Sequence, residues 1–316
     1  MPDNKQPRIL AAEPSALREA AKILREGGLV AVPTETVYGL AARADNAAAV
    51  ARIYSAKGRP DFNPLIVHVA DLATAQGIAH LDDRAMALAA RFWPGPLTMV
   101  LPRRDDAALA GAVAAGLPTV ALRCPAHPVM RELLAQTGLP LAAPSANRSG
   151  AVSPTTAVHV AASLGTNVDL IIDGGACAQG LESTIVALRA DGCWQLLRPG
   201  PIAGAEIAAV LGADPGNRGE ADAIEAPGQL ASHYAPGKPV RLNAVTAQKE
   251  EFHIGFGAVA GAVSLSPSGD LEEAAARLYA CLHTAAGAAQ PRIAVAPVPK
   301  EGVGAAINDR LSRAAA

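Results

Sequence analysis

Two cations and an amide share one short loop. Lys57, Arg59 and Asn63 lie in a segment rich in glycine and proline, and the apolar run 65–67 follows directly. Fixed cations and an amide at the mouth of a sheet would bind a polyanion such as a phosphate chain. An ordinary surface loop is the alternative, because glycine and proline form turns while lysine and arginine are usually exposed.

Polar residues at alternating positions recur near other predicted strand ends. Thr34 and Thr36 follow one apolar strand, and Ser145 and Asn147 follow another. Ligands bind at strand ends in open α/β sheets, so these side chains could converge on one site. Each pair could instead cap a turn, which is a common role for serine, threonine and asparagine.

Arg123 and His68 interrupt strands that are otherwise apolar. Alternation along the strand 119–123 turns Val120 and Leu122 to one face and Arg123 to the other. A buried guanidinium is costly when unpaired, so Arg123 either reaches a rim or meets an anion. His68 could be a ligand contact, although a core histidine with satisfied hydrogen bonds is the commoner case.

Strand and helix patterns alternate along the sequence as far as residue 211, and these elements must position the polar residues. We expect strands at 29–33, 65–69, 97–101, 119–123, 139–144, 169–172, 184–188 and 194–197. We expect helices at 15–26, 46–56, 82–92, 127–136, 155–164 and 205–211. This alternation indicates an α/β sheet, and a hairpin around 189–192 makes the sheet mixed rather than purely parallel.

The composition changes after residue 211. Residues 212–237 are rich in glycine, proline and acidic side chains and show no apolar period, which predicts a linker. Strand patterns at 239–245, 252–256 and 293–297 and helix patterns at 271–282 and 303–313 then predict a second, smaller α/β unit. The predicted division is therefore 1–211, 212–237 and 238–316.

Composition also excludes several classes of protein. The formal net charge of the 316 residues is −2, which argues against strong non-specific binding to nucleic acid. The four cysteines form no C-x-x-C pair, and no Walker loop or H-E-x-x-H motif occurs. The chain shows no signal-peptide pattern and no apolar run of about 18 residues, so no membrane span and a cytoplasmic location are expected.

Motifs spread over the whole chain resemble those of the YrdC-type threonylcarbamoyl-AMP synthases in their two-domain form. The catalytic-domain motifs are 33–40 (PTETVYGL), 57–60 (KGRP), 63–65 (NPL), 93–98 (WPGPLT), 145–150 (SANRSG) and 198–200 (RPG). The linker and the C-terminal domain contribute 227–229 (PGQ), 232–236 (SHYAP) and 302–314 (GVGAAINDRLSRA). The resemblance implies a YrdC-like twisted mixed sheet with helices, followed by a small Rossmann-like domain.

The resemblance also implies an activity. The family makes L-threonylcarbamoyladenylate and pyrophosphate from ATP, L-threonine and bicarbonate. Downstream proteins then transfer the threonylcarbamoyl group to an adenosine of tRNAs that read codons beginning with A, giving N6-threonylcarbamoyladenosine. The expected partners are the three substrates and the transfer proteins, with tRNA bound at most weakly. Mg²⁺ is expected with ATP, and no tightly bound organic cofactor is expected.

The resemblance assigns roles to individual residues. The expected ATP-binding residues are Lys57, Arg59, Asn63, Thr119, Ser145, Asn147, Ser153, Arg198 and Tyr234, with Lys57 and Arg59 as the catalytic phosphate clamp. The expected threonine-binding residues are Thr36, His68, Arg123, Ala143 through its backbone, and Ser183. A linker that supplies Tyr234 would act as a lid over a water-labile intermediate. Asp173 and Glu182 are possible outer ligands of the metal.

Two other functions are considered. A double-stranded RNA-binding module with a local basic face is one alternative, which the charge balance disfavours. The other is a hydrogenase-maturation carbamoyltransferase, because related domains occur in those enzymes. This chain has neither the length nor the cysteine pattern of their additional segments.

Overall fold

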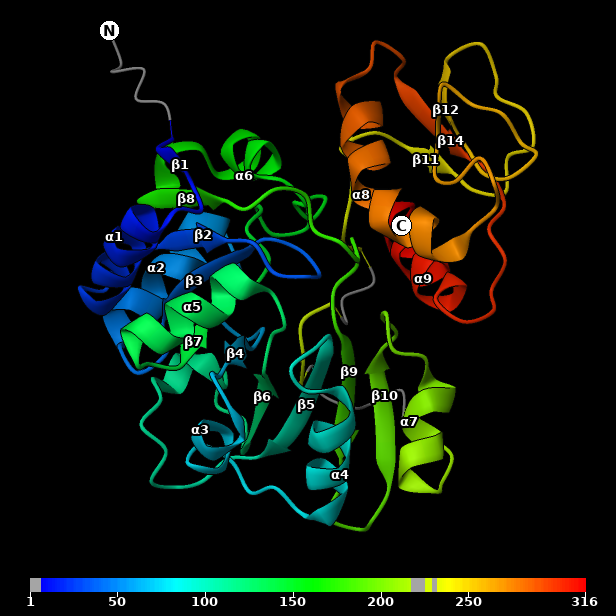
Figure 1. Cartoon of the computed structure of the whole chain (residues 1–316). Helices are drawn as coiled ribbons and strands as arrows, with labels where there is room; N and C mark the ends of the chain where they lie inside the picture. The colour runs from blue at the N-terminus through cyan, green and yellow to red at the C-terminus, as the bar shows by residue number, and fades with distance from the viewer. Residues whose placement is uncertain (1–6, 217–224, 229–231) are drawn as a thin grey trace, which may run out of the picture.

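The computed structural model describes residues 7–216, 225–228 and 232–316, so parts of the predicted linker and Gln229 of its PGQ motif lie outside the described residues. Figure 1 shows two α/β units side by side. The strands of the first sheet are β1 (Ile9–Ala11), β2 (Val30–Val32), β3 (Gly39–Arg43), β4 (Ile66–His68), β5 (Leu97–Pro102), β6 (Thr119–Arg123), β7 (Leu141–Ala142), β8 (Leu170–Asp173), β9 (Thr184–Leu188) and β10 (Trp194–Arg198).

Short connections and helices link these strands. The helices are α1 (Pro14–Arg25), α2 (Ala47–Lys57), α3 (Leu72–Gln76), α4 (Asp83–Phe92), α5 (Pro128–Thr137), α6 (Ala157–Leu164) and α7 (Gly204–Leu211), with 3₁₀ turns at Gly111–Val113 and Gly165–Asn167. The strand order is β1-β8-β2-β3-β7-β4-β6-β5-β9-β10. Parallel and antiparallel neighbours are mixed, and β9 and β10 form the predicted hairpin.

The two faces of this sheet are covered differently. One face packs along its length on apolar side chains from α2, α4 and α6. On the other face, α1 and α5 cover β2, β3, β7 and β8 with residues such as Leu24 and Leu133. Over β4, β6, β5 and β9 that second face carries only a small apolar cluster that includes Ile66 and Ala121. The part of this second face that α1 and α5 leave uncovered also carries His68 and Arg123, which were identified from the sequence.

The register of β4 and β6 places His68 and Arg123 next to each other on that face. The strands are parallel, with Ile66 opposite Ala121 and His68 opposite Arg123. Alternate residues share a face, so His68 and Arg123 lie next to each other. Val120 and Leu122 of β6 instead belong to the core on the opposite face, as the sequence alternation predicts.

The second unit contains β11 (Val240–Arg241), β12 (Glu251–Gly255), β13 (Val263–Ser264) and β14 (Arg292–Val295), with α8 (Leu271–Gly287) and α9 (Gly304–Ala314). All strand pairs are parallel in the order β11-β14-β12-β13, which is the Rossmann-like arrangement expected. In the sequence, the strands of the first sheet precede the predicted linker and those of the second sheet follow it. The exact domain boundaries stay a prediction. In Figure 1, α8 and α9 lie on the side of this unit that is nearer the first.

The two units share an apolar cluster. Val37, Val152 and Leu181 of the first unit belong to the same buried group as Leu278 of α8. Gly180 approaches the second unit closely, because a Cβ built there would lie 2.5 Å from the backbone oxygen of Ala275, and its φ is +67°. Only glycine fits a backbone contact of this kind. The second unit is therefore packed directly against the loop before Glu182.

Some elements differ from the sequence expectation. The strands β1, β3 and β13 and the helix α3 were not expected. The strand β3 is built from Gly39, Leu40, two alanines and Arg43, so it lacks the β-branched residues that usually mark a strand. The helix α2 extends one residue beyond the expected end, to Lys57, and stops where Gly58 takes a left-handed conformation. Among the described residues, no helix combines the length and apolarity needed to cross a membrane.

Stacked histidines join α6 to α8. The ring centroids of His159 and His283 are 3.9 Å apart, with an angle of 18° between the ring planes. Burial, together with the neighbouring His283 ring, lowers the pKa of His159 to about 4, and burial also lowers the pKa of His283. Both rings are therefore neutral in the folded protein near pH 7.

Acidification is expected to weaken the folded protein through this pair. An unfolded histidine takes up a proton near pH 6.5, whereas folded His159 does so only near pH 4, so stability falls as the pH drops through this interval. The measurement is the free energy of unfolding by denaturant between about pH 7.5 and about pH 5. His159→Gln should reduce the dependence on pH, and exposed His80→Gln should leave it unchanged. An equal slope in wild type and His159→Gln would contradict the prediction.

Candidate active site

A cavity lies on the partly covered face of the first sheet and is closed by residues of the linker. The residues that line it are Thr34, Thr36, Val37, Gly39, Arg59, Ile66, His68, Arg123, Ala143, Pro144, Ser145, Glu182, Ser183, Arg198, Pro227, Gly228, His233 and Tyr234. Every residue expected to bind threonine lines the cavity. Arg59, Ser145, Arg198 and Tyr234 of the expected ATP set also line it. The structure therefore brings most of the predicted site together.

Arg123 is buried against a carboxylate of the protein. Its Nη2 lies 2.7 Å from Oε1 of Glu35, and its Nη1 donates a hydrogen bond of 2.9 Å to Oγ1 of Thr36. Burial by itself raises the pKa of Glu35, but the Arg123 guanidinium more than offsets this and holds that pKa below its usual value. From the sequence we expected a ligand to supply the anion for Arg123, and Glu35 was missed as a partner within the chain.

His68 lies beside Arg123 and is almost fully buried. Burial and the Arg123 charge lower the pKa of His68 to about 3, so the imidazole is neutral near pH 7. Its Nδ1 has no hydrogen-bond partner among the described residues. A buried polar atom without a partner is unusual in a native protein. This observation favours a ligand contact over a core histidine whose hydrogen bonds are satisfied.

Arg59 and Arg198 supply positive charge elsewhere in the cavity. Arg59 donates to the backbone oxygens of Asn63 and Pro64, at 3.2 and 2.8 Å. Burial lowers the pKa of Arg59 to about 10, which leaves it charged at neutral pH. Arg198 follows a shift of register in the β9–β10 hairpin and donates to the backbone oxygen and the hydroxyl of Ser183, at 3.0 and 3.1 Å.

Lys57 donates hydrogen bonds to the protein backbone. Its Nζ donates to the backbone oxygens of Ser145 and Asn147, and Lys57 does not line the cavity. Burial, and then the charge of Arg59, lower the pKa of Lys57 well below its usual value. The ammonium group therefore fastens the end of α2 to the loop that carries Ser145. A direct contact with phosphate stays a prediction.

The remaining predicted residues lie outside the lining. The side chain of Asn147 donates to the backbone oxygens of Arg148 and Ala151, and Ser153 donates to Glu182 at 2.5 Å. The Oδ1 of Asn63 is buried and has no hydrogen-bond partner among the described residues. Thr119 is half-buried at the start of β6, opposite Pro102. The ATP-binding roles of these residues stay predictions.

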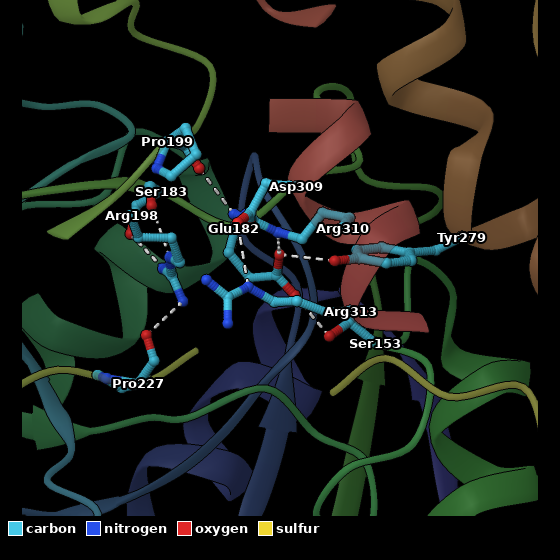
Figure 2. Close-up of polar contacts among 10 residues, drawn as sticks. All are labelled: Ser153, Glu182, Ser183, Arg198, Pro199, Pro227, Tyr279, Asp309, Arg310 and Arg313. Carbon is cyan, nitrogen blue, oxygen red and sulfur yellow. Dashed lines mark hydrogen bonds and ion pairs between the residues drawn. The ribbon is translucent and has the colours of Figure 1, made fainter. Parts of the chain in front are cut away.

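Glu182 collects donors from both units, as Figure 2 shows. Its Oε1 accepts from Ser153, and its Oε2 accepts from Tyr279 of α8 at 2.7 Å and from Arg310 of α9 at 2.9 Å. Burial alone would raise the pKa of Glu182, but Arg310 and Arg198 lower it to about 2. Both carboxylate oxygens accept hydrogen bonds from protein donors, which does not favour Glu182 as a metal ligand.

Tyr234 connects the linker to both units. Its side chain is 1% exposed, lines the cavity and belongs to the apolar cluster of the second unit. Its ring lies 5.2 Å from the Arg310 guanidinium. The position is compatible with the predicted contact to a nucleotide, and the lid function stays a prediction.

The fold and the cavity define a class of protein. This is a two-unit α/β protein with a buried, cationic cavity that is suited to an anionic ligand and is lined in part by residues 227–228 and 233–234. Residues 22–200 match the Sua5/YciO/YrdC family model, described as telomere recombination. Residues 202–316 match the model described as threonylcarbamoyl-AMP synthase, C-terminal domain. The chain belongs to the two-domain form of this Sua5/YciO/YrdC family.

Relatives match along nearly the whole chain. A threonylcarbamoyl-AMP synthase of Bacillus subtilis is 40% identical over 97% of this chain and 94% of its own length. A threonylcarbamoyl-AMP synthase of Pyrococcus abyssi is 39% identical over 94% of this chain and 93% of its own length. The crystal structure of P. abyssi Sua5 complexed with L-threonine matches with a TM-score of 0.87 and 36% identity, covering 98% of this chain and 97% of that one.

The position of Lys57 predicts a loss of stability when its ammonium is removed. Lys57→Ala would leave two buried backbone oxygens without a donor, and the free energy of unfolding should fall by about 3 kcal/mol. Chemical denaturation followed by circular dichroism measures this change. Lys22→Ala, at a lysine whose side chain is 70% exposed, is the control and should change the value by less than about 0.5 kcal/mol. Unaltered stability of Lys57→Ala would show that the ammonium does not hold the loop.

Proposed function

We infer that this chain is an L-threonylcarbamoyladenylate synthase, a nucleotidyltransferase that forms L-threonylcarbamoyladenylate and pyrophosphate from ATP, L-threonine and bicarbonate. The observation that carries this inference is the single cavity in which Arg123 and His68 lie beside Thr36 while Arg59 and Arg198 supply further cations. The chain matches named synthases over almost its full length.

The amino acid is assigned to the Arg123 side of the cavity. A guanidinium can hold a carboxylate through two parallel hydrogen bonds, and Arg123 keeps a rigid position through Glu35 and Thr36. The threonine carboxylate would share Arg123 with Glu35. Neutral His68 and the hydroxyl of Ser183 are available for the polar groups of threonine, as is the backbone near Ala143. The relative that was crystallised with L-threonine supports threonine as the amino acid.

The phosphates are assigned to Arg59 and Arg198. Both guanidinium groups are buried and charged, and both use some of their donors on backbone oxygens, which fixes their directions. Fixed charges in a site shielded from water interact strongly with a polyanion. Ser145 and Tyr234 would contact the same nucleotide, and Lys57 would act by holding the Ser145 loop.

The reaction needs positioning more than a covalent intermediate. The neutral amine of threonine takes up bicarbonate with loss of water and gives a carbamate. A carbamate oxygen then attacks the α-phosphorus of ATP, and the bond to the pyrophosphate breaks as the new P–O bond forms. The charge that develops on the transferred group and on the pyrophosphate is balanced by Arg59 and Arg198.

Magnesium is proposed to arrive with ATP as part of the substrate. Among the described residues, no group of three or more histidine, cysteine, aspartate or glutamate side chains is placed to hold an ion. Glu182 has protein donors on both oxygens, and Asp173 accepts from the backbone nitrogen of Gly175. We therefore propose that the triphosphate itself supplies most of the ligands of Mg²⁺.

The product serves tRNA modification. Its mixed anhydride is an activated threonylcarbamoyl group, which downstream proteins would transfer to an adenosine of tRNAs that read codons beginning with A, giving N6-threonylcarbamoyladenosine. A double-stranded RNA-binding module is not favoured, because the relatives that match nearly the whole chain are named as synthases. Direct binding of tRNA is proposed to be weak at most.

The reaction can be tested on the full chain with ATP, L-threonine, bicarbonate and Mg²⁺. We expect pyrophosphate release that depends on threonine, together with a product of the mass of threonylcarbamoyl-AMP. Mass spectrometry after a short incubation detects the adenylate, and the same mixture without threonine is the control. Folded protein that gives neither product would overturn the proposed function.

Arg59→Ala should abolish most of this turnover. Loss of one fixed cation at the phosphates should lower the rate of pyrophosphate release by at least about 100-fold, in the range found when a single charge-stabilising donor is removed. Exposed Arg18→Ala, in α1, is the control and should retain the wild-type rate. Circular dichroism establishes that both variants are folded. Near-normal turnover of Arg59→Ala would refute the phosphate assignment.

A further inference from the structure

The second unit reaches the cavity through one buried arginine. We propose that Arg310 of α9 is a positioning residue for nucleotide binding, because it neutralises and orients Glu182 and fixes the Arg198–Gly200 segment. This inference rests on the proposed function, since it concerns the ATP side of the same cavity. It gives the C-terminal unit a role in the site that is distinct from closing it.

Arg310 cannot touch a ligand itself. Its side chain is 0% exposed and does not line the cavity. Its Nε donates to Oε2 of Glu182 at 2.9 Å, and its Nη2 donates to the backbone oxygen of Pro199 at 2.9 Å. Pro199 follows Arg198 directly in the chain, so one guanidinium holds both the carboxylate and the backbone beside a phosphate-binding cation (Figure 2).

Glu182 needs such a partner because of where it lies. Glu182 lines the cavity and is 6% exposed, so its negative charge faces the space that is proposed to take a triphosphate. Charges that are shielded from water interact over several ångströms with little screening. An unpaired Glu182 would therefore repel the phosphates. Arg310 pairs with Glu182 and also with Asp309, and Arg313 pairs with Asp309 as well, so two arginines balance the two carboxylates.

The same carboxylate also orients Ser153. The hydroxyl of Ser153 donates to Oε1 of Glu182, and the backbone oxygen of Ser153 lies 3.1 Å from Nε2 of His283 in α8. The hydroxyl of Tyr279, also in α8, donates to Glu182 from the other side. Residues of α8 and α9 thus fix a residue that is expected to bind ATP without contacting the nucleotide themselves.

The test measures binding of MgATP and of L-threonine separately, by titration calorimetry on the full chain. Arg310→Gln leaves the Glu182 charge unpaired and should raise the dissociation constant for MgATP by at least about tenfold, the order expected from one uncompensated charge. The double variant Glu182→Gln/Arg310→Gln removes both charges and should recover MgATP affinity to within about threefold of wild type. The affinity for threonine should stay unchanged in both variants.

A purely structural role predicts a different pattern. If Arg310 only held the two units together, the single and double variants would lose MgATP and threonine binding alike. That result, or wild-type affinity for MgATP in Arg310→Gln, would overturn the proposal. Arg277→Gln, in an exposed ion pair of α8, is the matched control and should bind both ligands normally.

A milder variant covers the case in which Arg310→Gln does not fold. Tyr279→Phe removes a single donor to Glu182 and should weaken MgATP binding by about threefold. Wild-type affinity for MgATP in Tyr279→Phe would then overturn the proposal. Threonine-dependent pyrophosphate release by the wild type tests the proposed function independently. A failure of that reaction is therefore distinguishable from a failure of the Arg310 assignment.

Discussion

Burial of positive charge is the constraint on which the site depends. Arg59, Arg123, Arg198 and Arg310 are all less than 9% exposed, and a cation removed from water must be given oxygen partners. The chain supplies backbone oxygens to Arg59 and Arg198 and carboxylates to Arg123 and Arg310. These partners consume only part of the donor capacity of each guanidinium. They also fix the direction of each group before any ligand arrives, which lowers the cost of ordering the site upon binding.

Two carboxylates near the cavity pair with buried arginines, one within the first unit and one between the two units. Glu35 and Arg123 both belong to the first unit and form a pair within it. Glu182 belongs to the first unit as well, but its arginine partner lies in the second. The amino-acid side of the cavity is therefore complete within the first sheet and its loops. The side proposed for the nucleotide also depends on Arg310 of the C-terminal unit, which contacts Glu182 and the backbone of Pro199.

The features that could be predicted from the sequence are those that local pattern determines. Alternation along β6 separated Arg123 from the core residues Val120 and Leu122, and the structure confirms that separation. Prediction failed where a contact joins residues that are distant in the sequence, and where a single residue determines the end of a helix. The contact between Glu182 and Arg310 spans 128 positions and exists only after two units pack together. Residue Lys57 was expected in a loop, whereas α2 continues through Lys57 and stops at Gly58. The motifs include Lys57 and Arg310 but not Glu182, and only the packing shows what each residue contacts.

Gly180 has a consequence for how such a chain could be assembled from parts. A Cβ there would meet the backbone of Ala275 and Ala276 at 2.5 Å, and a main chain cannot rotate aside as a side chain can. Some relatives match only part of this chain, such as the Vibrio vulnificus protein, which covers 59% of it with 99% of its own length. A one-domain relative could accept a graft of this C-terminal unit only if it already carried a residue without a side chain at the equivalent point. One missing methyl group thus sets the compatibility between modules that otherwise fold around separate sheets.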